Sequence, residues 1–392
     1  MFGRYFVAPL FTLLFVCAGT YARGADAPSV NVDVLLSMSG SGTFVGNIER
    51  DSLNVLESMV NKDGGIRGRP LHFVYHDDQT DPQVAIQLLN AIVANHRPLV
   101  LGSSTTAPCH GIEPIVEANG PVDYCFTPAI YPARGSFMFS SSVASLDEVS
   151  AMVRYFRERG WKRIALVTAT DVGGQEADSN VDAVLARPEN KGQVTLVDRE
   201  HFNATDLTVM AQLAKIKAAE PQAVILWASG TPFTTLLRDA ASIGLDLPIA
   251  ATNADMTYVQ MKQYATFLPK ELLFPGVPYL AGIAPTKPAR DVQRRFFDAM
   301  GAAGIRPDFI YSVAWDPGLI AVEALRTIGT SATADQVRAF IENLHGFNGI
   351  IGEYDFRDGS QRGLTEDNVM MMRWDAAENT WTAVSRLGGQ PL

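Results

Sequence analysis

Four hydroxyl side chains in a row form the part of this sequence best suited to bind a small molecule. Gly102-Ser103-Ser104-Thr105-Thr106 follows a short apolar segment and precedes a predicted helix. A helix N-terminus offers unpaired N–H groups and the positive end of the helix dipole, and adjacent hydroxyls add further donors. The pattern therefore predicts a carboxylate site. The alternative is that one hydroxyl only caps the helix, although four exceed what capping requires.

Polar and aromatic segments also follow other predicted strands, in both halves of the chain. Residues 127–132 follow a strand in the first half, and residues 171–175, 227–233 and 253–256 follow strands in the second. Ligands of open parallel sheets bind beyond the carboxyl ends of the strands, so we expect these segments to line one cleft. The candidate ligand contacts are Ser104, Thr105, Thr106, Ala129, Ile130, Tyr131, Gly173, Trp227, Gly230, Thr231, Phe233, Asn253, Asp255, Tyr311 and Trp315.

No motif in the sequence points to an enzyme or a metal site. The G-x-S-x-G, H-E-x-x-H and P-loop motifs are absent. Glycines within residues 40–46 depart from the G-x-G-x-x-G spacing of dinucleotide sites. His76-Asp77-Asp78 resembles a metal cluster, but aspartates at a strand end are typical of turns, and Asp81 before Pro82 is better explained as a helix cap. We expect no catalytic residue, no metal and no cofactor.

Strands and helices alternate along the chain, and this alternation predicts the fold that positions the candidate ligand loops. The predicted strands cover about residues 30–36, 71–76, 99–101, 122–126, 164–167, 194–197, 224–227, 249–251, 352–356, 369–374 and 381–384. Helices fill the intervals, and Ser145-Leu146-Asp147-Glu148 matches the S-x-x-E capping box at the start of one of them. Two βαβα series predict an α/β fold of two lobes, each a parallel sheet flanked by helices, with a cleft between them.

The N-terminus and the overall charge indicate an exported protein. Arg4, an apolar stretch over residues 6–18 and Ala22-Arg23-Gly24 predict a signal peptide over residues 1–24, and no later run resembles a membrane span. We expect a periplasmic protein. The formal charge of −10 argues against nucleic-acid binding, which needs a basic patch. In an oxidising compartment Cys109 and Cys125 either pair or remain two buried thiols.

Several motifs carry a resemblance to a known family. They are Leu36-Ser37-Met38-Ser39-Gly40, N-K-D-G-G-I-R-G-R-P-L at residues 61–71, D-D-Q-T-D-P at 77–82 and G-I-I-G-E-Y-D-F at 349–356. From about Val32 to the C-terminus the chain resembles the branched-chain amino acid (Leu/Ile/Val) type of ABC-transporter solute-binding protein.

The resemblance implies a type I periplasmic binding protein fold, with three interdomain crossovers near Ser140, Val277 and Tyr354. Lobe 1 would hold residues 28–140 and 277–353, and lobe 2 would hold residues 141–276 and 354–392. The resemblance also implies that the loop of Thr105 and Thr106 meets the ligand carboxylate and that residues 129–131 add donors.

Some positions depart from the amino-acid binders of that family. Ile130-Tyr131 replaces their Ala-Thr, Gly173-Gly174 lacks their aromatic, and the acid that would meet an ammonium group is replaced around Asn253, with Asp255 close by. Residues 227–233 and 314–317 look more like relatives assigned to aromatic acid uptake.

We therefore expect a monomeric receptor that captures a small carboxylate, an aromatic acid, by hinge closure and delivers it to an ABC permease. It would bind no nucleic acid and would not insert stably in the membrane. The alternatives are a branched-chain amino acid binding protein and a ligand-sensing receptor subunit.

Overall fold

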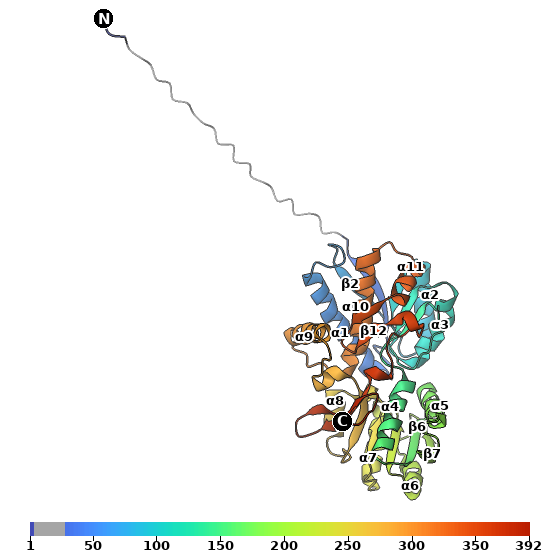
Figure 1. Ribbon diagram of the computed structural model, residues 1–392. Coiled ribbons are helices and arrows are strands. Elements are labelled where there is room, and N and C mark those ends of the chain that lie inside the picture. The colour runs from blue at the N-terminus through green and yellow to red at the C-terminus, as the bar shows by residue number, and fades with distance from the viewer. Residues whose placement is uncertain (4–27) are drawn as a thin grey trace.

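The computed structural model describes residues 1–3 and 28–392, so the predicted signal peptide lies almost wholly outside the described residues. Residues 28–392 form two lobes, an upper one that carries α1, α2 and α3 and a lower one that carries α4 to α7 (Figure 1). One lobe is built on a five-stranded sheet and the other on a seven-stranded sheet. The α/β class and the two-lobed arrangement predicted from the sequence are confirmed.

The five-stranded sheet has the order β2-β1-β3-β4-β5 and is parallel throughout. Its strands are β1 (Val30–Leu36), β2 (Leu71–Asp77), β3 (Leu99–Leu101), β4 (Val122–Cys125) and β5 (Met138–Ser140). The helices between them are α1 (Thr43–Lys62), α2 (Pro82–Ala94) and α3 (Thr106–Asn119). Apolar clusters lie on both faces of this sheet, which explains why its strands read as continuous apolar runs.

Three helices from the second half of the chain complete the upper lobe: α9 (Lys287–Ala302), α10 (Phe309–Ile328) and α11 (Ala334–Glu342). Helix α10 packs along α1, and α9 also contacts α1 (Figure 1). The upper lobe therefore combines segments that lie more than two hundred residues apart in the sequence.

The seven-stranded sheet has the order β14-β13-β10-β9-β8-β6-β7. Its parallel strands are β6 (Arg163–Ala169), β7 (Thr195–Phe202), β8 (Ala223–Trp227), β9 (Ile249–Ala251) and β10 (Leu272–Gly276). The associated helices are α4 (Ser145–Glu158), α5 (Val172–Ala186), α6 (Met210–Ala218), α7 (Thr231–Ser242) and α8 (Tyr258–Tyr264).

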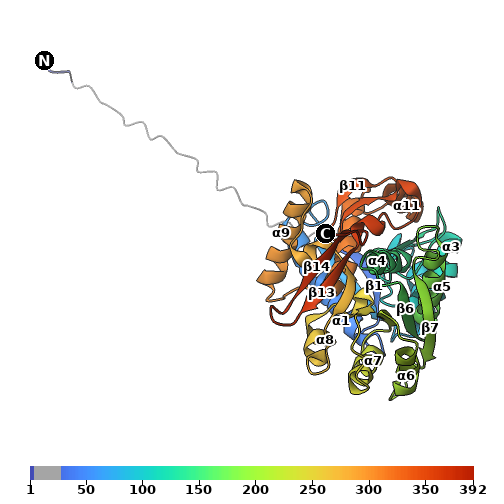
Figure 2. The ribbon, with the colours of Figure 1, turned by 60° about the horizontal axis from the view of Figure 1, so that its bottom comes forward.

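The C-terminal part of the chain forms two antiparallel hairpins. The strands β11 (His345–Asn348) and β12 (Glu353–Asp355) make a separate two-stranded sheet. The strands β13 (Met370–Asp375) and β14 (Thr380–Leu387) extend the seven-stranded sheet, because β13 pairs antiparallel with β10. Figure 2 shows this hairpin at the edge of the sheet, beside the C-terminus.

Three strands, β5, β10 and β11, were not predicted. Strand β5 is only three residues long, which is too short to show a periodic pattern. Strand β10 contains Pro275 and ends at Gly276, and both residue types argue against a strand in the sequence. Pro275 is tolerated where β10 meets the antiparallel β13.

The helix caps agree with prediction at one position and differ at another. Asp81 caps α2 as expected, because its carboxylate accepts a hydrogen bond from Gln83 N–H at 2.7 Å. The capping box predicted at Ser145 is wrong. Ala144 is the N-cap, Ser145 is already helical, and the Glu148 side chain turns away to a buried partner on the neighbouring strand end.

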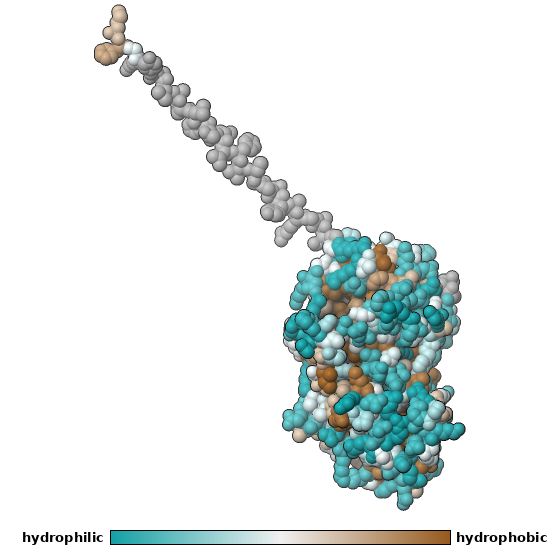
Figure 3. All heavy atoms as spheres, in the orientation of Figure 1, coloured by the Kyte–Doolittle hydropathy of each residue, from teal (hydrophilic) through white to brown (hydrophobic). Residues whose placement is uncertain are grey.

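The surface is mainly hydrophilic, and apolar side chains gather in patches near the waist between the lobes (Figure 3). Within residues 28–392, no helix combines the length and the apolar character needed to cross a membrane.

Candidate functional site

The loops at the carboxyl ends of the two sheets meet where the lobes face each other. Gly230, at the start of α7, has a φ of +66°, and a Cβ added there would lie 3.2 Å from the Phe44 ring of α1. Helices α3 and α5 also make contact across the lobes. The strand-end segments singled out in the sequence therefore converge on one region.

Two hydroxyls at the start of α3, those of Thr105 and Thr106, do not cap the helix. Thr105 is the N-cap residue, but its side chain makes no capping hydrogen bond, and its Oγ1 is buried without a partner among the described residues. The Oγ1 atoms of Thr106 and Thr127 lie 3.1 Å apart. For Thr105 the capping alternative is thus wrong, and an unpaired buried hydroxyl is a costly feature that a ligand would relieve.

The other two hydroxyls of this run belong to a structural network. Ser103 donates to the Asp78 carboxylate, and Ser37 donates to the same group at 2.8 Å. The Ser104 oxygen accepts from Ser37 N–H at 3.0 Å. Burial raises the pKa of Glu49, which lies beside Ser104, to about 8. A hydrogen bond from Ser104 lowers this pKa, but burial has the larger effect. These contacts fix the loop that carries the two threonines.

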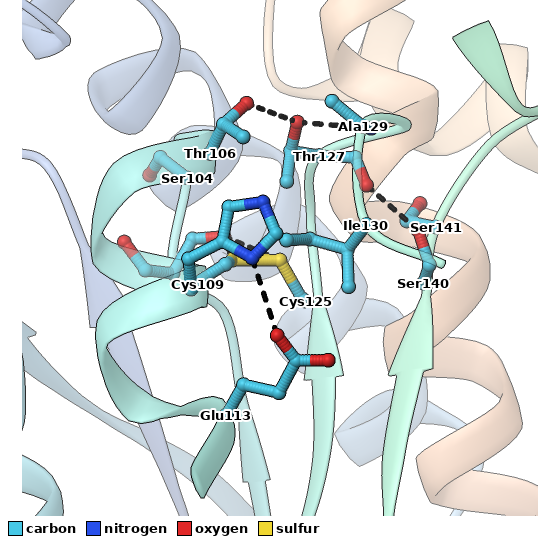
Figure 4. Close-up of a disulfide and its surroundings, with 12 residues drawn as sticks. Ser104, Thr106, Cys109, Glu113, Cys125, Thr127, Ala129, Ile130, Ser140 and Ser141 are labelled. Atoms are coloured by element: carbon cyan, nitrogen blue, oxygen red, sulfur yellow. Dashed lines mark hydrogen bonds and ion pairs between the residues drawn. A yellow bond between two sulfur atoms is a disulfide. The ribbon is translucent and has the colours of Figure 1, made fainter. Parts of the chain in front are cut away.

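A disulfide joins Cys109 to Cys125, which decides between the two alternatives left open by the sequence. Their Cα atoms are 6.2 Å apart. Figure 4 shows the bridge beneath the loop that carries Thr127 and Ala129, with Thr106 on the adjoining helix turn. The bridge therefore ties the first turn of α3 to the end of β4, the two elements that carry the facing threonines.

The loop after β4 presents its residues in different directions. The Ala129 N–H donates to Thr127 Oγ1 at 3.3 Å, and the Ile130 side chain is fully buried in the apolar cluster around the disulfide. Tyr131 is 48% exposed, and its hydroxyl donates to the Glu176 carboxylate of α5 at 2.7 Å. The same hydroxyl accepts from Leu146 N–H at 3.1 Å.

Arg362 fixes the position of the loop after β4 through hydrogen bonds to its carbonyl groups. It is 4% exposed, and its guanidinium donates to the carbonyls of Pro128 at 3.0 Å and Ile130 at 2.5 Å. It also donates to the carbonyls of Ser141 and Ser142, at 3.0 and 3.1 Å, just after β5. One side chain thus links the loop to the segment that leads from the first sheet toward the second.

On the opposite lobe, the two polar candidates are turned into the protein. Asp255 accepts hydrogen bonds from Gly230 N–H at 3.0 Å and from Gln260 at 2.5 Å, and burial raises its pKa to about 8. Asn253 donates to Glu148 at 2.5 Å, and burial raises the pKa of that glutamate well above its ordinary value. Asp255 therefore supports the Gly230 loop.

The aromatic candidates separate into core and rim residues. Phe233 packs against Tyr264 with ring centroids 5.5 Å apart, and Trp315 packs against Phe296 at 4.9 Å. Phe233 and Trp315 are fully buried or nearly so, whereas Trp227 keeps 8% exposure at the end of β8. Tyr311 is half-buried.

The remaining candidates stand at the starts of helices in the lower lobe. Gly173 lies in the first turn of α5, where an added Cβ would meet only Asp171, at 3.6 Å. Thr231 is exposed in the first turn of α7. A side chain at Gly173 would therefore meet open space beside the start of α5.

The acidic segment after β2 serves the fold. Asp77 accepts from the N–H groups of Met38 and Ser39, and Asp78 accepts from Thr80 N–H. Residues 1–3 and 28–392 contain no group of three His, Cys, Asp or Glu side chains placed to hold a metal ion.

Four further residues, Phe44, Glu49, Glu176 and Arg362, belong to this region and escaped the sequence-based prediction. Phe44 lies two residues after Gly42, in the first turn of α1, so its position just beyond a strand-end loop was a usable signal. The other three lie within helices or in a late loop, where the sequence gives no pattern that points to a cleft.

Comparisons with known proteins identify the family and the fold. The profile of a family described as periplasmic binding protein matches residues 29–379. The leucine-, isoleucine-, valine-, threonine- and alanine-binding protein of Pseudomonas aeruginosa is 22% identical over 268 residues, which span 66% of this chain and 70% of that protein.

Two solved structures share the fold. A branched-chain amino acid transporter substrate binding protein of Streptococcus pneumoniae, in complex with isoleucine, has a TM-score of 0.73 at 15% identity over 91% of this chain and 99% of its own. An ABC-transporter solute binding protein of Rhodopseudomonas palustris, in complex with benzoate, has a TM-score of 0.75 at 17% identity over 93% and 97%.

Proposed function

Since this chain belongs to the periplasmic binding protein family, we propose that it is an extracytoplasmic receptor that captures a small carboxylate and delivers it to an ABC importer. The observation that carries the proposal is the buried Thr105 hydroxyl at the start of α3, which has no partner among residues 28–392, together with the hydroxyl of the next residue, Thr106. The first N–H groups of α3 have no partners within the helix. Together these donors suit a carboxylate.

The mechanism we propose is hinge closure between lobe 1, residues 28–140 and 277–353, and lobe 2, residues 141–276 and 354–392. A ligand held by α3 of lobe 1 and by the Gly230 loop of lobe 2 would favour the closed state. It would shift the equilibrium only by its difference in affinity for the two states. The contact between Gly230 and Phe44 and the Tyr131–Glu176 hydrogen bond support this division, because both join the proposed lobes.

The ligand class we propose is an aromatic acid. An amino acid would bring an ammonium group into the cleft, where a buried charge needs a partner. Asp255, which is close to that position in the sequence, is buried and accepts hydrogen bonds at one oxygen from Gly230, Gln260 and Tyr264, and its raised pKa of about 8 favours the neutral form. The space beside Gly173 would admit a flat ring, and Tyr131 and Trp227 are available to contact it. The benzoate complex of the Rhodopseudomonas palustris protein is consistent with this class.

A branched-chain amino acid is the second candidate, favoured by the names of the relatives. A competition between leucine and 4-hydroxybenzoate in one calorimetric titration separates the two. We expect 4-hydroxybenzoate or a related aromatic acid to bind and leucine to compete weakly. Micromolar binding of leucine with no response to any aromatic acid would establish the amino-acid reading instead.

A further inference from the structure

Arg362 is a buried cation whose side-chain hydrogen bonds to the described residues all go to backbone carbonyls. Its guanidinium donates to four backbone carbonyls, those of Pro128, Ile130, Ser141 and Ser142. Within residues 28–392, no carboxylate forms an ion pair with it. Arginine keeps its charge in proteins, and a buried charge is costly unless something compensates it. Carbonyl dipoles compensate part of this charge, and an anion in the adjacent cleft would compensate more.

The hydrogen bonds of the loop form a chain from Arg362 to the carboxylate site. The guanidinium donates to the Pro128 carbonyl, and the N–H of the same peptide group, on Ala129, donates to Thr127 Oγ1 at 3.3 Å. Thr127 Oγ1 lies 3.1 Å from Thr106 Oγ1 (Figure 4). With its oxygen accepting from Ala129, Thr127 can donate its own proton to Thr106. The Thr106 proton then remains free for a ligand.

A chain of this kind has a direction. Each donor polarises the next, so a cation at one end strengthens the outermost hydroxyl as a donor. The Ile130 carbonyl also points at Arg362, and in a trans peptide group the N–H of the next residue, Tyr131, points the opposite way. Both features direct positive potential toward the α3 side of the loop.

We infer that Arg362 is a positioning residue that makes this site selective for anions, by holding the Pro128–Tyr131 loop and polarising Thr106 through Ala129 and Thr127. The inference rests on the proposed function, because it concerns the same carboxylate site. It adds a requirement that the ligand be charged. The titratable groups that face Arg362 are Tyr124, Tyr131, Asp147 and Glu148. The hydrogen bonds of Arg362 to the described residues go to carbonyl groups, not to either of these two acids.

The experiment compares each acid with its primary amide, which has nearly the same shape but lacks the carboxylate charge. The probes are benzoate with benzamide, 4-hydroxybenzoate with 4-hydroxybenzamide, and leucine with leucinamide, titrated by calorimetry into the full mature protein. In the wild type, we expect the bound acid to be preferred over its amide by at least about tenfold, the effect of hydrogen bonds to a charged group. In Arg362→Gln this preference should fall at least about threefold, because the N–H groups of α3 remain while the polarising charge is lost.

Three variants separate positioning from general stability. Arg362→Lys keeps the charge and should keep most of the preference, even if the protein is less stable. Thr127→Val breaks the chain but leaves Arg362 in place, and should lower the preference by at least about threefold, the effect of one hydrogen bond. Arg326→Gln is the matched control. Arg326 donates to the Gly65 carbonyl at 3.0 and 2.9 Å, away from the loop, and its loss should leave the preference unchanged.

The outcomes are distinct. An amide that binds the wild type as tightly as its acid would overturn the inference without any variant. So would an unchanged preference in Arg362→Gln, or in Thr127→Val if Arg362→Gln does not fold. Failure of every probe to bind the wild type would contradict the proposed carboxylate function itself, and the inference with it.

Discussion

The Tyr131 hydroxyl and the Glu176 carboxylate are 2.7 Å apart, and this hydrogen bond links the loop after β4 to helix α5 of the other lobe. Asn180 Nδ2 supports both groups, at 3.3 Å from the tyrosine oxygen and 3.1 Å from the glutamate. Tyr131 was singled out in the sequence as a ligand contact. Its observed bonds join the two lobes.

Loss of the Tyr131 hydroxyl should favour an open protein. We expect Tyr131→Phe to increase the radius of gyration of the ligand-free protein and to speed ligand release roughly threefold to tenfold, as one or two lost hydrogen bonds would. Small-angle scattering and stopped-flow kinetics measure these effects. Tyr75→Phe is the control, because Tyr75 donates to Asn54 within one lobe, at 2.8 Å. Equal radii and release rates in all three proteins would contradict a role in closure.

Thr106→Ala should weaken carboxylate binding at least about tenfold, because a hydrogen bond to a charged group is worth roughly 1.5–3 kcal/mol. The fold should remain intact, since Thr106 bonds only Thr127 through its side chain. Thr286→Ala provides the comparison. That threonine caps α9 and should cost about 1 kcal/mol of stability with no change in affinity. Unchanged affinity in Thr106→Ala would move the anion site elsewhere.

Removal of the disulfide should cost both stability and affinity. Cys109 and Cys125 are 16 residues apart, and closing a loop of this length contributes about 3 kcal/mol to the free energy of unfolding. We expect Cys109→Ala/Cys125→Ala to lose about that amount in urea unfolding. The double variant should also bind more weakly, because Thr106 and Thr127 lie on the two segments that the bridge joins. Reduction of the wild type should reproduce both effects and leave the variant unaffected.

Asp255 should make stability depend on pH. Burial raises its pKa to about 8, so the folded state retains a proton that the unfolded chain releases near pH 4. This contribution is fully present below about pH 4 and is lost as the pH rises to about 8, with a slope of up to about 1.4 kcal/mol per pH unit. Asp255→Asn keeps an acceptor for Gly230 and should become more stable relative to the wild type between pH 5 and 8.

Asp239→Asn tests the sign of that argument. Burial raises the pKa of Asp239, but hydrogen bonds from Val209 N–H, Thr208 and Arg238 outweigh burial and leave the pKa below its ordinary value. This carboxylate stabilises the fold above the unfolded pKa, so its neutral variant should be less stable at pH 7. If the two variants show the same pH profile in thermal unfolding, burial of Asp255 does not control its titration.

The sequence predicted the sheets and the strand-end loops well, because buried parallel strands appear as short apolar runs between helix caps. It could not predict which of the candidate aromatic side chains are buried in a lobe core. Phe233 stands one helix turn beyond Gly230, yet it points into the lobe core. Arg362 was beyond reach for another reason. It is 234 residues from Pro128, and only the folded chain brings the two together.

The position of β13 has a consequence for the order in which the chain can fold during synthesis. Strand β10 ends at residue 276, but its antiparallel neighbour begins only at residue 370. While the ribosome synthesises the intervening residues, the β10 edge of the second sheet has no partner strand. An unpaired edge can pair with another chain. Helices α9 and α10 likewise reach α1 late. By the lobe bounds proposed above, all segments of the upper lobe exist once residue 353 has been synthesised, whereas the second sheet completes its edge only when the last hairpin emerges.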